Sequence, residues 1–352
     1  MRSGVVKKIL FKTLSLTCQP FNRFGNRKQE ALTNLQCNLD KEGTLSSNNV
    51  TSIFTDNDGI TWIGAWKGGI NYSFKYNKGF QNISHEMNQN NSLIHNNVRF
   101  IFEDHEGDLW IGTSGGLSYL DHTTGKFHNF EQKNQKLFET DFIYCINELN
   151  KGEIWIGFEY GGILIYSKRN KSFRRFHFPG KLKKYSKDIS VFSLDKDQKG
   201  NTWIGSNMGI IKKKKKSNTW HHYDTSNSNI PSNKIICSYM DRQGTLWFGT
   251  EFGFCKYDQD NNQFHPYRFF QLENKFNHPY IYGFYEDPNG NFWIASKGMG
   301  LFLFNRETST YKNFTTENNF PSNVITGMLS DESGNLWLST VQGLVKFDYS
   351  NQ

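Results

Sequence analysis

The chain has 352 residues, a formal net charge of +8 and an aromatic content of 16%. It is long enough to bury a sizeable core, and no stretch approaches the roughly 18 uninterrupted apolar residues of a membrane-spanning helix. The one dense basic run, Lys212 to Lys216, contains no stacking aromatic, so nucleic-acid binding is not indicated. We expect that run to form a charged outer hairpin. The net charge would suit an acidic polysaccharide, but scattered solvated basic residues explain it more simply.

Residues 1–30 stand apart from the rest of the chain and are predicted to be a leader or a disordered N-terminus. Basic residues precede a short apolar run that Lys12 interrupts, which makes a poor secretory signal. Cys18 weakly resembles a lipoprotein cleavage site. A degenerate leader and a misplaced start codon both remain open.

From residue 31 onward a unit recurs at intervals of 44 to 48 residues, each copy being marked by a tryptophan. The seven tryptophans are Trp62, Trp110, Trp155, Trp203, Trp247, Trp293 and Trp337. Self-similarity at this period is typical of a solenoid or a propeller. Six copies carry an Asp three residues before a Gly just ahead of the tryptophan, which predicts a turn, whereas the third copy has Leu149 before Gly152.

Each unit contains four short strand patterns, which together make one propeller blade. In the first unit the first strand is VTSIFTD, the tryptophan opens the second, Gly69 begins the third, and spaced apolar residues mark the fourth. Residues 31–36 align with the fourth strand at 79–84, and the chain ends just after the third strand of the seventh unit. The sequence therefore predicts an all-β, seven-bladed β-propeller over residues 31–352, closed by the N-terminal strand completing the last blade.

The unit N-x-V-x-x-I-x-x-D-x-x-G-x-x-W-I-G-x-x-x-G-G-I resembles the two-component regulator propeller repeat over roughly residues 31 to 349. The resemblance implies the periplasmic sensor region of a bacterial hybrid histidine kinase, many of which detect oligosaccharides. It predicts a ligand-sensing propeller at the periplasm or cell surface, without a kinase module of its own or a membrane span. Its expected partners are an oligosaccharide and an adjacent propeller or kinase-linked domain. A fragment of a longer receptor and a stand-alone relative both remain open.

The turns between second and third strands should surround the mouth of the central channel, the usual place for a ligand. The candidate ligand-binding residues there are Trp66, Lys67, Glu159, Tyr160, Asn207, Glu251, Phe252 and Lys297. The aromatic rings would stack on sugars and the polar groups would bind hydroxyls or a uronate. Arg99, Tyr144 and Tyr282 follow the first residue of their inner strands and are expected near the channel or in blade packing.

No catalytic motif, metal site or cofactor is predicted. The five cysteines contain no CxxC, and Cys145, Cys237 and Cys255 fall in predicted strands, where a small buried thiol is expected. The pair His221-His222 is interpreted as a surface pair. Two other functions remain: a scaffold that binds a protein or glycan, and an enzyme resembling the streptogramin lyases, which are also propellers. No residue of their metal-assisted site can be carried over to this chain.

Overall fold

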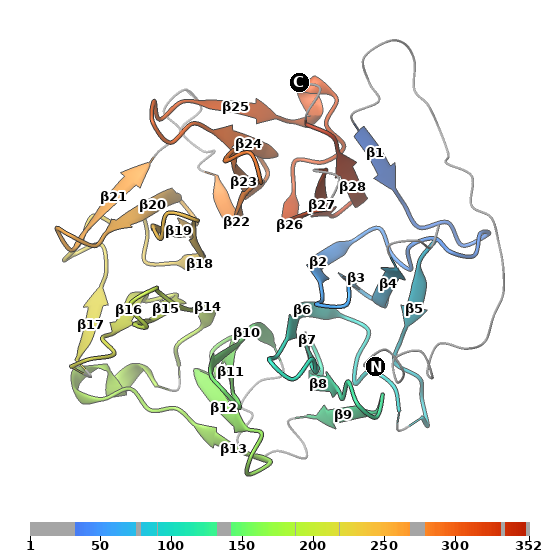
Figure 1. The fold of residues 1–352 in the computed structure, drawn as a ribbon, viewed down its shortest axis with the longest axis horizontal. Coiled ribbons are helices and arrows are strands. Elements are labelled where there is room, and N and C mark those ends of the chain that lie inside the picture. The colour runs from blue at the N-terminus through green and yellow to red at the C-terminus, as the bar shows by residue number, and fades with distance from the viewer. Residues whose placement is uncertain are drawn as a thin grey trace. The chain divides into compact units, whose positions relative to one another are not determined.

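The computed structural model describes residues 32–74, 79–89, 91–131, 142–186, 188–217, 219–267, 279–331 and 335–349. They form a seven-bladed β-propeller of seven four-stranded sheets, each ordered from the first strand of a unit to its fourth (Figure 1). The predicted fold class is therefore confirmed. The predicted leader, including Cys18, lies outside the described residues.

The strands follow the repeat along the chain. Blade 1 contains β2 (Val50–Thr55), β3 (Ile60–Ala65), β4 (Gly69–Phe74) and β5 (Gln81–Ile83), and blade 2 contains β6 (Val98–Glu103), β7 (Leu109–Thr113), β8 (Gly116–Leu120) and β9 (Phe127–Phe130). Blade 3 contains β10 (Ile143–Asn150), β11 (Glu153–Phe158), β12 (Ile163–Ser167) and β13 (Ser172–Arg175), and blade 4 contains β14 (Val191–Lys196), β15 (Thr202–Ser206), β16 (Gly209–Lys213) and β17 (Trp220–Tyr223). Blade 5 contains β18 (Ile235–Met240), β19 (Leu246–Thr250), β20 (Gly253–Asp258) and β21 (Gln263–Tyr267), and blade 6 contains β22 (Tyr280–Glu286), β23 (Phe292–Lys297), β24 (Leu301–Phe304) and β25 (Tyr311–Phe314). Blade 7 contains β26 (Ile325–Ser330), β27 (Leu336–Thr340), β28 (Gly343–Phe347) and β1 (Leu32–Leu35), and the two short 3-10 helices are η1 (Gly180–Tyr185) and η2 (Thr316–Asn318).

The chain divides into two compact units. One contains blades 1 and 2 together with β27, β28 and β1, and the other runs from Tyr144 to Met328 and contains blades 3 to 6. In the first unit a core cluster joins blades 1 and 2 through side chains such as Trp62 and Leu109. In the second unit an aromatic cluster surrounds Trp247 between blades 5 and 6.

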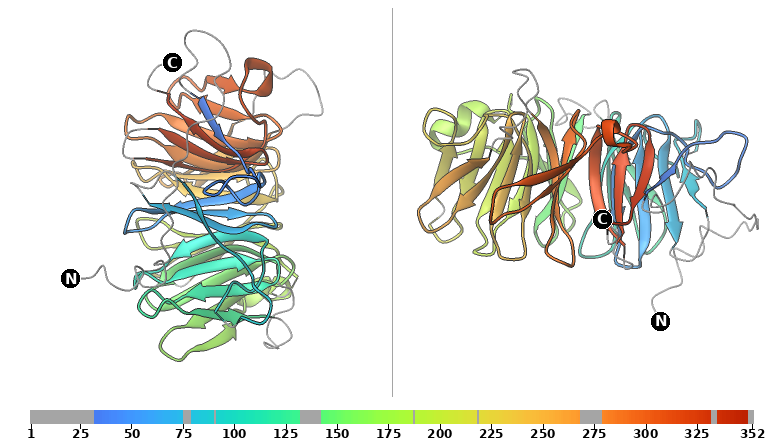
Figure 2. Two further views of the ribbon diagram at one scale, coloured as in Figure 1. Left: turned by 90° about the vertical axis from the view of Figure 1, so that its right-hand side faces the viewer. Right: turned by 90° about the horizontal axis from the view of Figure 1, so that it is seen from above.

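The N-terminal strand completes the last blade, as the sequence alignment predicts. Strand β1 pairs antiparallel with β28, with Leu32 opposite Phe347 and Leu35 opposite Leu344. In Figures 1 and 2 the blue β1 lies beside the red strands of blade 7. This pairing covers an edge of β28 that would otherwise expose unpaired backbone groups.

The Asp-Gly turns carry a hydrogen-bond network that explains their recurrence. In blade 2, Asp104 Oδ1 accepts the backbone amide of Glu106 at 2.9 Å, while Oδ2 accepts the indole N–H of Trp110 at 2.7 Å. The turn glycine Gly107 has a φ of +87°, which only glycine adopts without strain. The same Asp–Trp bond, at 2.7 to 3.0 Å, occurs in six blades, at Asp56–Trp62, Asp104–Trp110, Asp197–Trp203, Asp241–Trp247, Asp287–Trp293 and Asp331–Trp337.

Blade 3, which has Leu149 in place of the Asp, has a different hairpin. Its first strand continues through Asn150, and the side chain of Glu148 accepts the amide of Gly152. Arg174, on the fourth strand β13 of the same blade, pairs with Glu153 at 2.9 Å. The longer first strand β10 thus takes the place of the turn that an Asp forms in the other six blades.

The Gly after the tryptophan is required by packing between strands. A Cβ on Gly249 would lie 2.6 Å from the Cys237 sulfur on the first strand and 2.8 Å from Ile281 of the next blade. In blade 6 the glycine is on the first strand instead of the second. Ala295 takes the position of Gly249 on the second strand, and the residue paired with it on the first strand is Gly283. The pair, rather than either residue, keeps the two strands in contact.

One expectation about the lysine run is wrong. Lys212 is only 5% exposed rather than solvated, because its register opposite Trp203 lays the side chain across two rings. Its Nζ lies 4.5 Å from the ring centroids of Trp203 and Tyr257 and donates to the Tyr257 hydroxyl at 2.8 Å. Burial lowers the pKa of Lys212 to about 8. The thiols of Cys145 and Cys255 are buried as expected, whereas Cys237 is half-buried.

Candidate functional site

The predicted ligand-binding residues lie at the turns between the second and third strands, at the ends of β3, β11, β15, β19 and β23. These turns are tied to residues that directly precede the first strands. The amide of Lys67 donates to the Asn97 side chain at 2.8 Å, and the amide of Tyr160 donates to the Ser190 hydroxyl at 3.1 Å. These bonds hold Lys67 and Tyr160 at φ values of +61° and +51°.

In the second unit, four residues of blades 4 to 6 form what we term the lysine–tyrosine cluster: Phe192, Lys234, Tyr280 and Lys297. Lys234 Nζ lies 5.3 Å from the Tyr280 ring centroid and 5.9 Å from that of Phe192. Lys297 Nζ lies 5.8 Å from the Tyr280 centroid. One tyrosine ring is thus within cation–π range of two ammonium groups.

Lys234 is held in its charged form. Burial by itself would lower the pKa of its ammonium group, but a hydrogen bond with Tyr280 and the nearby Glu251 carboxylate outweigh burial and leave the pKa above its usual value. Glu251 in turn accepts the Ser232 hydroxyl at 2.9 Å. The predicted residue Glu251 therefore lies beside a cation that the sequence analysis did not select.

Blade 3 contributes the predicted residues Tyr144 and Glu159, which the structure brings together. The Tyr144 hydroxyl donates to Glu159 Oε1 at 2.9 Å. The Tyr144 ring also lies 4.9 Å from the ring of Phe192, centroid to centroid. This contact continues the aromatic surface from blade 3 to the lysine–tyrosine cluster, and Tyr282 extends it from Tyr280 at a centroid distance of 5.2 Å.

The first unit has its own aromatic and cationic group, which we term the arginine sandwich. The guanidinium carbon of Arg99 lies 5.4 Å from the Trp66 ring centroid and 4.9 Å from that of Phe142. Its Nε donates to the Ser114 hydroxyl at 3.0 Å. The predicted residues Trp66 and Arg99 therefore meet, and Arg99 serves as a cation held between two rings.

The remaining predicted residues differ in exposure. Tyr160 is 66% exposed and Phe252 is 48% exposed, so both present aromatic surface to solvent. Asn207 has a structural contact, since its side-chain oxygen accepts the Ser190 amide at 3.0 Å. Lys67 is exposed at the tip of its turn.

Sequence reasoning missed Phe142, Phe192 and Lys234. They occur at two positions of the repeat. Phe142 and Lys234 come just before a first strand, and Phe192 is the second residue of one. The first of these positions is Asn49 and Asn97 in blades 1 and 2, and is an aromatic residue in blade 3 and a basic residue in blade 5. That change from a turn-tying amide to a large side chain was the available signal.

Chemically, the two groups offer flat aromatic faces beside ammonium and guanidinium donors, and the lysine–tyrosine cluster also has the Glu251 carboxylate close by. Such a mixture suits ligands that combine stacking surface with hydroxyl or acidic groups. Within the described ranges, no set of three or more His, Cys, Asp or Glu lies together as a metal-binding group. No helix among those residues is long and apolar enough to cross a membrane.

Five segments match the model of the two component regulator propeller: residues 44–67, 92–115, 229–252, 275–298 and 319–342. The family resemblance of the repeat is thereby confirmed. Comparison with curated proteins gives no match.

Several solved structures share the fold. The extracellular domain of BT4673 from B. thetaiotaomicron, a hybrid two component system, superposes with a TM-score of 0.70 at 20% identity, covering 91% of this chain and 43% of that one. Streptogramin B lyase gives 0.66 at 14% identity, with 90% and 97% covered, and YCF48 from Cyanidioschyzon merolae gives 0.62 at 11%, with 92% and 100% covered. This chain thus spans less than half of the BT4673 domain, and likeness at these identities concerns the fold alone.

Proposed function

Because the chain carries repeats of the two component regulator propeller, we propose that it is a ligand-sensing propeller of a two-component signal-transduction receptor that detects oligosaccharides. The observation that carries this proposal is the placement of aromatic rings beside cations at the starts of the first strands and at the neighbouring turns between second and third strands. Pyranose rings stack on aromatic faces, while lysine, arginine and carboxylate groups bind their polar substituents.

The contacts favour a binding role over a structural one for these groups. A cation–π contact at an exposed site contributes only about 0.5–1 kcal/mol, so a ligand can take over part of it at little cost to the fold. Lys297 and Tyr160 are exposed, which leaves them accessible to a molecule arriving from solvent. A buried structural cluster would not present such side chains.

The proposal places the chain at the periplasm or cell surface, where it would pass ligand occupancy to an adjacent propeller or kinase-linked domain. Coupling of this kind requires an element with two states whose equilibrium the ligand changes. A scaffold that binds a protein or glycan without signalling is the alternative. The likeness to streptogramin B lyase extends only to the fold, so we propose no enzymatic role.

A thermal-shift screen against neutral and acidic oligosaccharides tests the proposal. A ligand that binds only the folded chain stabilises it by about 2.7 kcal/mol at a hundredfold excess over its dissociation constant. We expect one glycan class to raise the Tm, and Tyr280→Ala and Lys297→Met to abolish that rise. Lys312→Met is the matched control, because Lys312 makes the same kind of contact, 5.1 Å from the Phe314 ring, but lies on the fourth strand β25 opposite Leu303.

Two results would contradict the proposal. If no glycan raises the Tm, the sensing role for oligosaccharides fails and the scaffold alternative gains support. If a glycan raises the Tm equally in wild type, Tyr280→Ala and Lys297→Met, the ligand binds elsewhere and the lysine–tyrosine cluster is not its site.

A further inference from the structure

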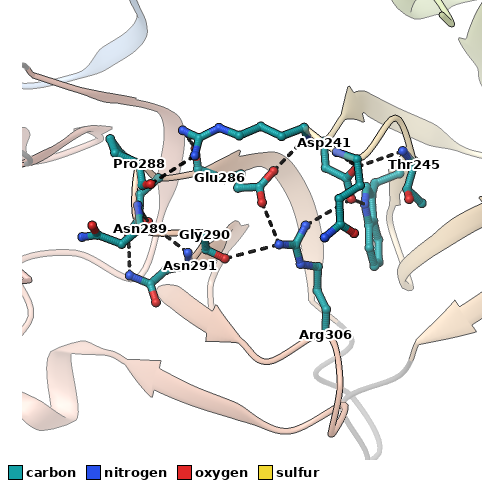
Figure 3. Close-up of polar contacts among 12 residues, drawn as sticks. Asp241, Thr245, Glu286, Pro288, Asn289, Gly290, Asn291 and Arg306 are labelled. Atoms are coloured by element: carbon teal, nitrogen blue, oxygen red, sulfur yellow. Dashed lines mark hydrogen bonds and ion pairs between the residues drawn. The ribbon is translucent and has the colours of Figure 1, made fainter.

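The junction between blades 5 and 6 contains an arginine bound by two acidic side chains. Arg306 Nη1 donates to Asp241 Oδ2 at 3.2 Å, and Nη2 donates to Glu286 Oε1 at 2.6 Å (Figure 3). Nη2 also donates to the carbonyl oxygen of Gly290 at 3.3 Å, and the guanidinium lies 5.2 Å from the Phe292 ring centroid. The arginine side chain is 20% exposed and the two carboxylates at most 4%.

The junction between blades 1 and 2 repeats this construction at the same positions of the repeat. Asp56 and Glu103 correspond to Asp241 and Glu286. The likeness includes the backbone, since Glu103 Oε2 accepts the Asn57 amide at 3.1 Å just as Glu286 Oε2 accepts the Arg242 amide at 2.9 Å. We term the group of Arg306, Asp241 and Glu286 the clasp. Residues equivalent to both of its carboxylates are therefore present in the first unit.

The cation is the part that differs. The position of Arg306, two residues after β24, is occupied after β8 by His122, whose Nε2 lies 3.5 Å from Asp58 Oδ2 instead. In the part of the chain that the structure describes, no lysine or arginine forms an ion pair with Asp56 or Glu103. In the sequence of blade 3, Glu148 is at the position of Glu103 and Lys168 is at the position of His122. Blade 2 alone therefore combines a Glu at the first position with a histidine at the second.

A cavity of about 40 Å³ lies at this junction. Its lining includes Asp56, Gly107, Leu109 and His122, which correspond to Asp241, Gly290, Phe292 and Arg306 at the junction between blades 5 and 6. Glu103 is not a lining residue; it lies next to the cavity, where it accepts the Asn57 amide. Trp62 and Leu120 complete an apolar wall, and Leu120 is smaller than the Phe304 at its equivalent position. This volume has room for more than one water-sized group.

The cavity is also more acidic than the clasp it resembles. Asp58, at the rim, replaces the neutral Gln243 of blade 5, and its side chain is 60% exposed. Burial raises the pKa of Asp56 and of Glu103, and the nearby carboxylates raise it further. A cation in the cavity, beside these carboxylates, would offset both the burial of the charges and their mutual repulsion.

We propose that the cavity between blades 1 and 2 binds the guanidinium group of an arginine side chain presented by a partner protein. The planar guanidinium bridges two carboxylates at once, as Arg306 does within this chain, which an ammonium group does with poorer geometry. The exposed Asp58 marks the direction of entry. This site is separate from the lysine–tyrosine cluster and from the arginine sandwich.

Binding is measured by NMR on the full chain through the indole N–H of Trp62, which donates to Asp56 Oδ2 and is assigned with Trp62→Phe. The probe is N-acetyl-arginine amide, and its neutral isostere N-acetyl-citrulline amide is the control. We expect only the arginine probe to shift the Trp62 signal. Glu103→Gln, which retains an acceptor for the Asn57 amide, should weaken binding at least about tenfold, because hydrogen bonds to charged groups are worth ~1.5–3 kcal/mol.

Two variants test the correspondence between the junctions. His122→Arg supplies the guanidinium from within, and we expect it to raise the Tm and abolish the response to the arginine probe. Arg306→Ala empties the other clasp, and we expect it to lower the Tm and to be partly restored by millimolar N-ethylguanidinium but not by N-ethylurea.

Three outcomes would overturn the proposal: no shift of the Trp62 signal with the arginine probe, an equal shift with the citrulline probe, or an unchanged response in both Glu103→Gln and His122→Arg. A response to the arginine probe that Asp58→Asn also weakens supports entry past the exposed rim.

Discussion

The two kinds of turn within a blade satisfy their polar groups in different ways. At the turns between first and second strands, a carboxylate such as Asp104 is surrounded by the chain's own donors, the Trp110 indole and the turn amides. At the turns between second and third strands, cations lie against aromatic rings instead, as Arg99 does against Trp66. Tyr160, at one such turn, remains 66% exposed.

The difference indicates which part of the blade stabilises the fold and which is available for binding. A buried carboxylate with several donors is costly to disturb, because each donor loses its acceptor. A cation over an exposed ring contributes little to folding. Substitutions at the two kinds of turn should therefore separate stability from ligand response.

Asp241→Ala removes the acidic centre of the most heavily bonded turn and should have the largest effect. It removes the acceptor of the Trp247 indole and of the Thr245 amide, and one of the acceptors of the Arg306 guanidinium. We expect a loss of about 3–5 kcal/mol in the free energy of unfolding, the range for breaking a buried pair, measured by urea denaturation. Asp241→Asn, which keeps an acceptor for the indole, should lose less, and equal losses would contradict this account.

Asp195 provides a contrast, because it lies on β14, the strand that ends just before the turn residue Asp197. It accepts the Ser238 hydroxyl, and burial raises the pKa of Asp195 to about 7. Since the folded-state pKa lies above the unfolded value, this group's contribution to stability is present below about pH 4 and is lost as the pH rises to 7. Asp195→Asn should therefore stabilise the chain relative to wild type by about 2–4 kcal/mol at pH 8 and by little at pH 4.

Urea unfolding of wild type and Asp195→Asn at pH 4, 6 and 8 measures this difference. Ser193→Ala on the same strand is the control for disturbance of the inner strand. A difference that stays constant across the three pH values would show that the Asp195 carboxyl does not titrate in this window.

Lys67→Gly tests a turn between second and third strands and should have the smallest effect on stability. Lys67 adopts a φ of +61° at an exposed turn, which costs about 1 kcal/mol in a residue with a Cβ. Glycine removes that cost but gains freedom in the unfolded chain, so we expect a net stabilisation of up to about 1 kcal/mol, seen as a higher Tm. A clear loss of stability would mean that the lysine side chain has a structural role.

Much of the fold was predictable because the repeat fixes it seven times over. The spacing of the tryptophans gave the blades, and the alignment of residues 31–36 with 79–84 placed Leu32–Leu35 on the last blade. The Asp–Trp bond was not foreseen, since it depends on the hairpin register that brings residues six apart into contact. Lys212 was misplaced for a similar reason, because its register opposite Trp203 buries it.

The candidate site was less accessible to sequence reasoning. The turn positions followed from the repeat, but the contacts at those turns join residues of neighbouring blades. Lys234 of blade 5 meets Phe192 of blade 4 and Tyr280 of blade 6. Pattern within one repeat does not reveal which side chains of two different repeats approach each other, so Lys234 was overlooked.

The exchange between Gly283 and Ala295 has a consequence for engineering and for the evolution of such chains. A blade that is grafted or duplicated from another repeat must therefore bring its first and second strands together. A hybrid that paired the Cys237 strand with the Ala295 strand would place the Cβ of the alanine at the position of Gly249. A Cβ there would lie only 2.6 Å from the Cys237 sulfur. Recombination within a hairpin should thus be penalised, whereas recombination at the links between blades should be tolerated. The first and second strands of a blade should therefore be exchanged together and not one at a time.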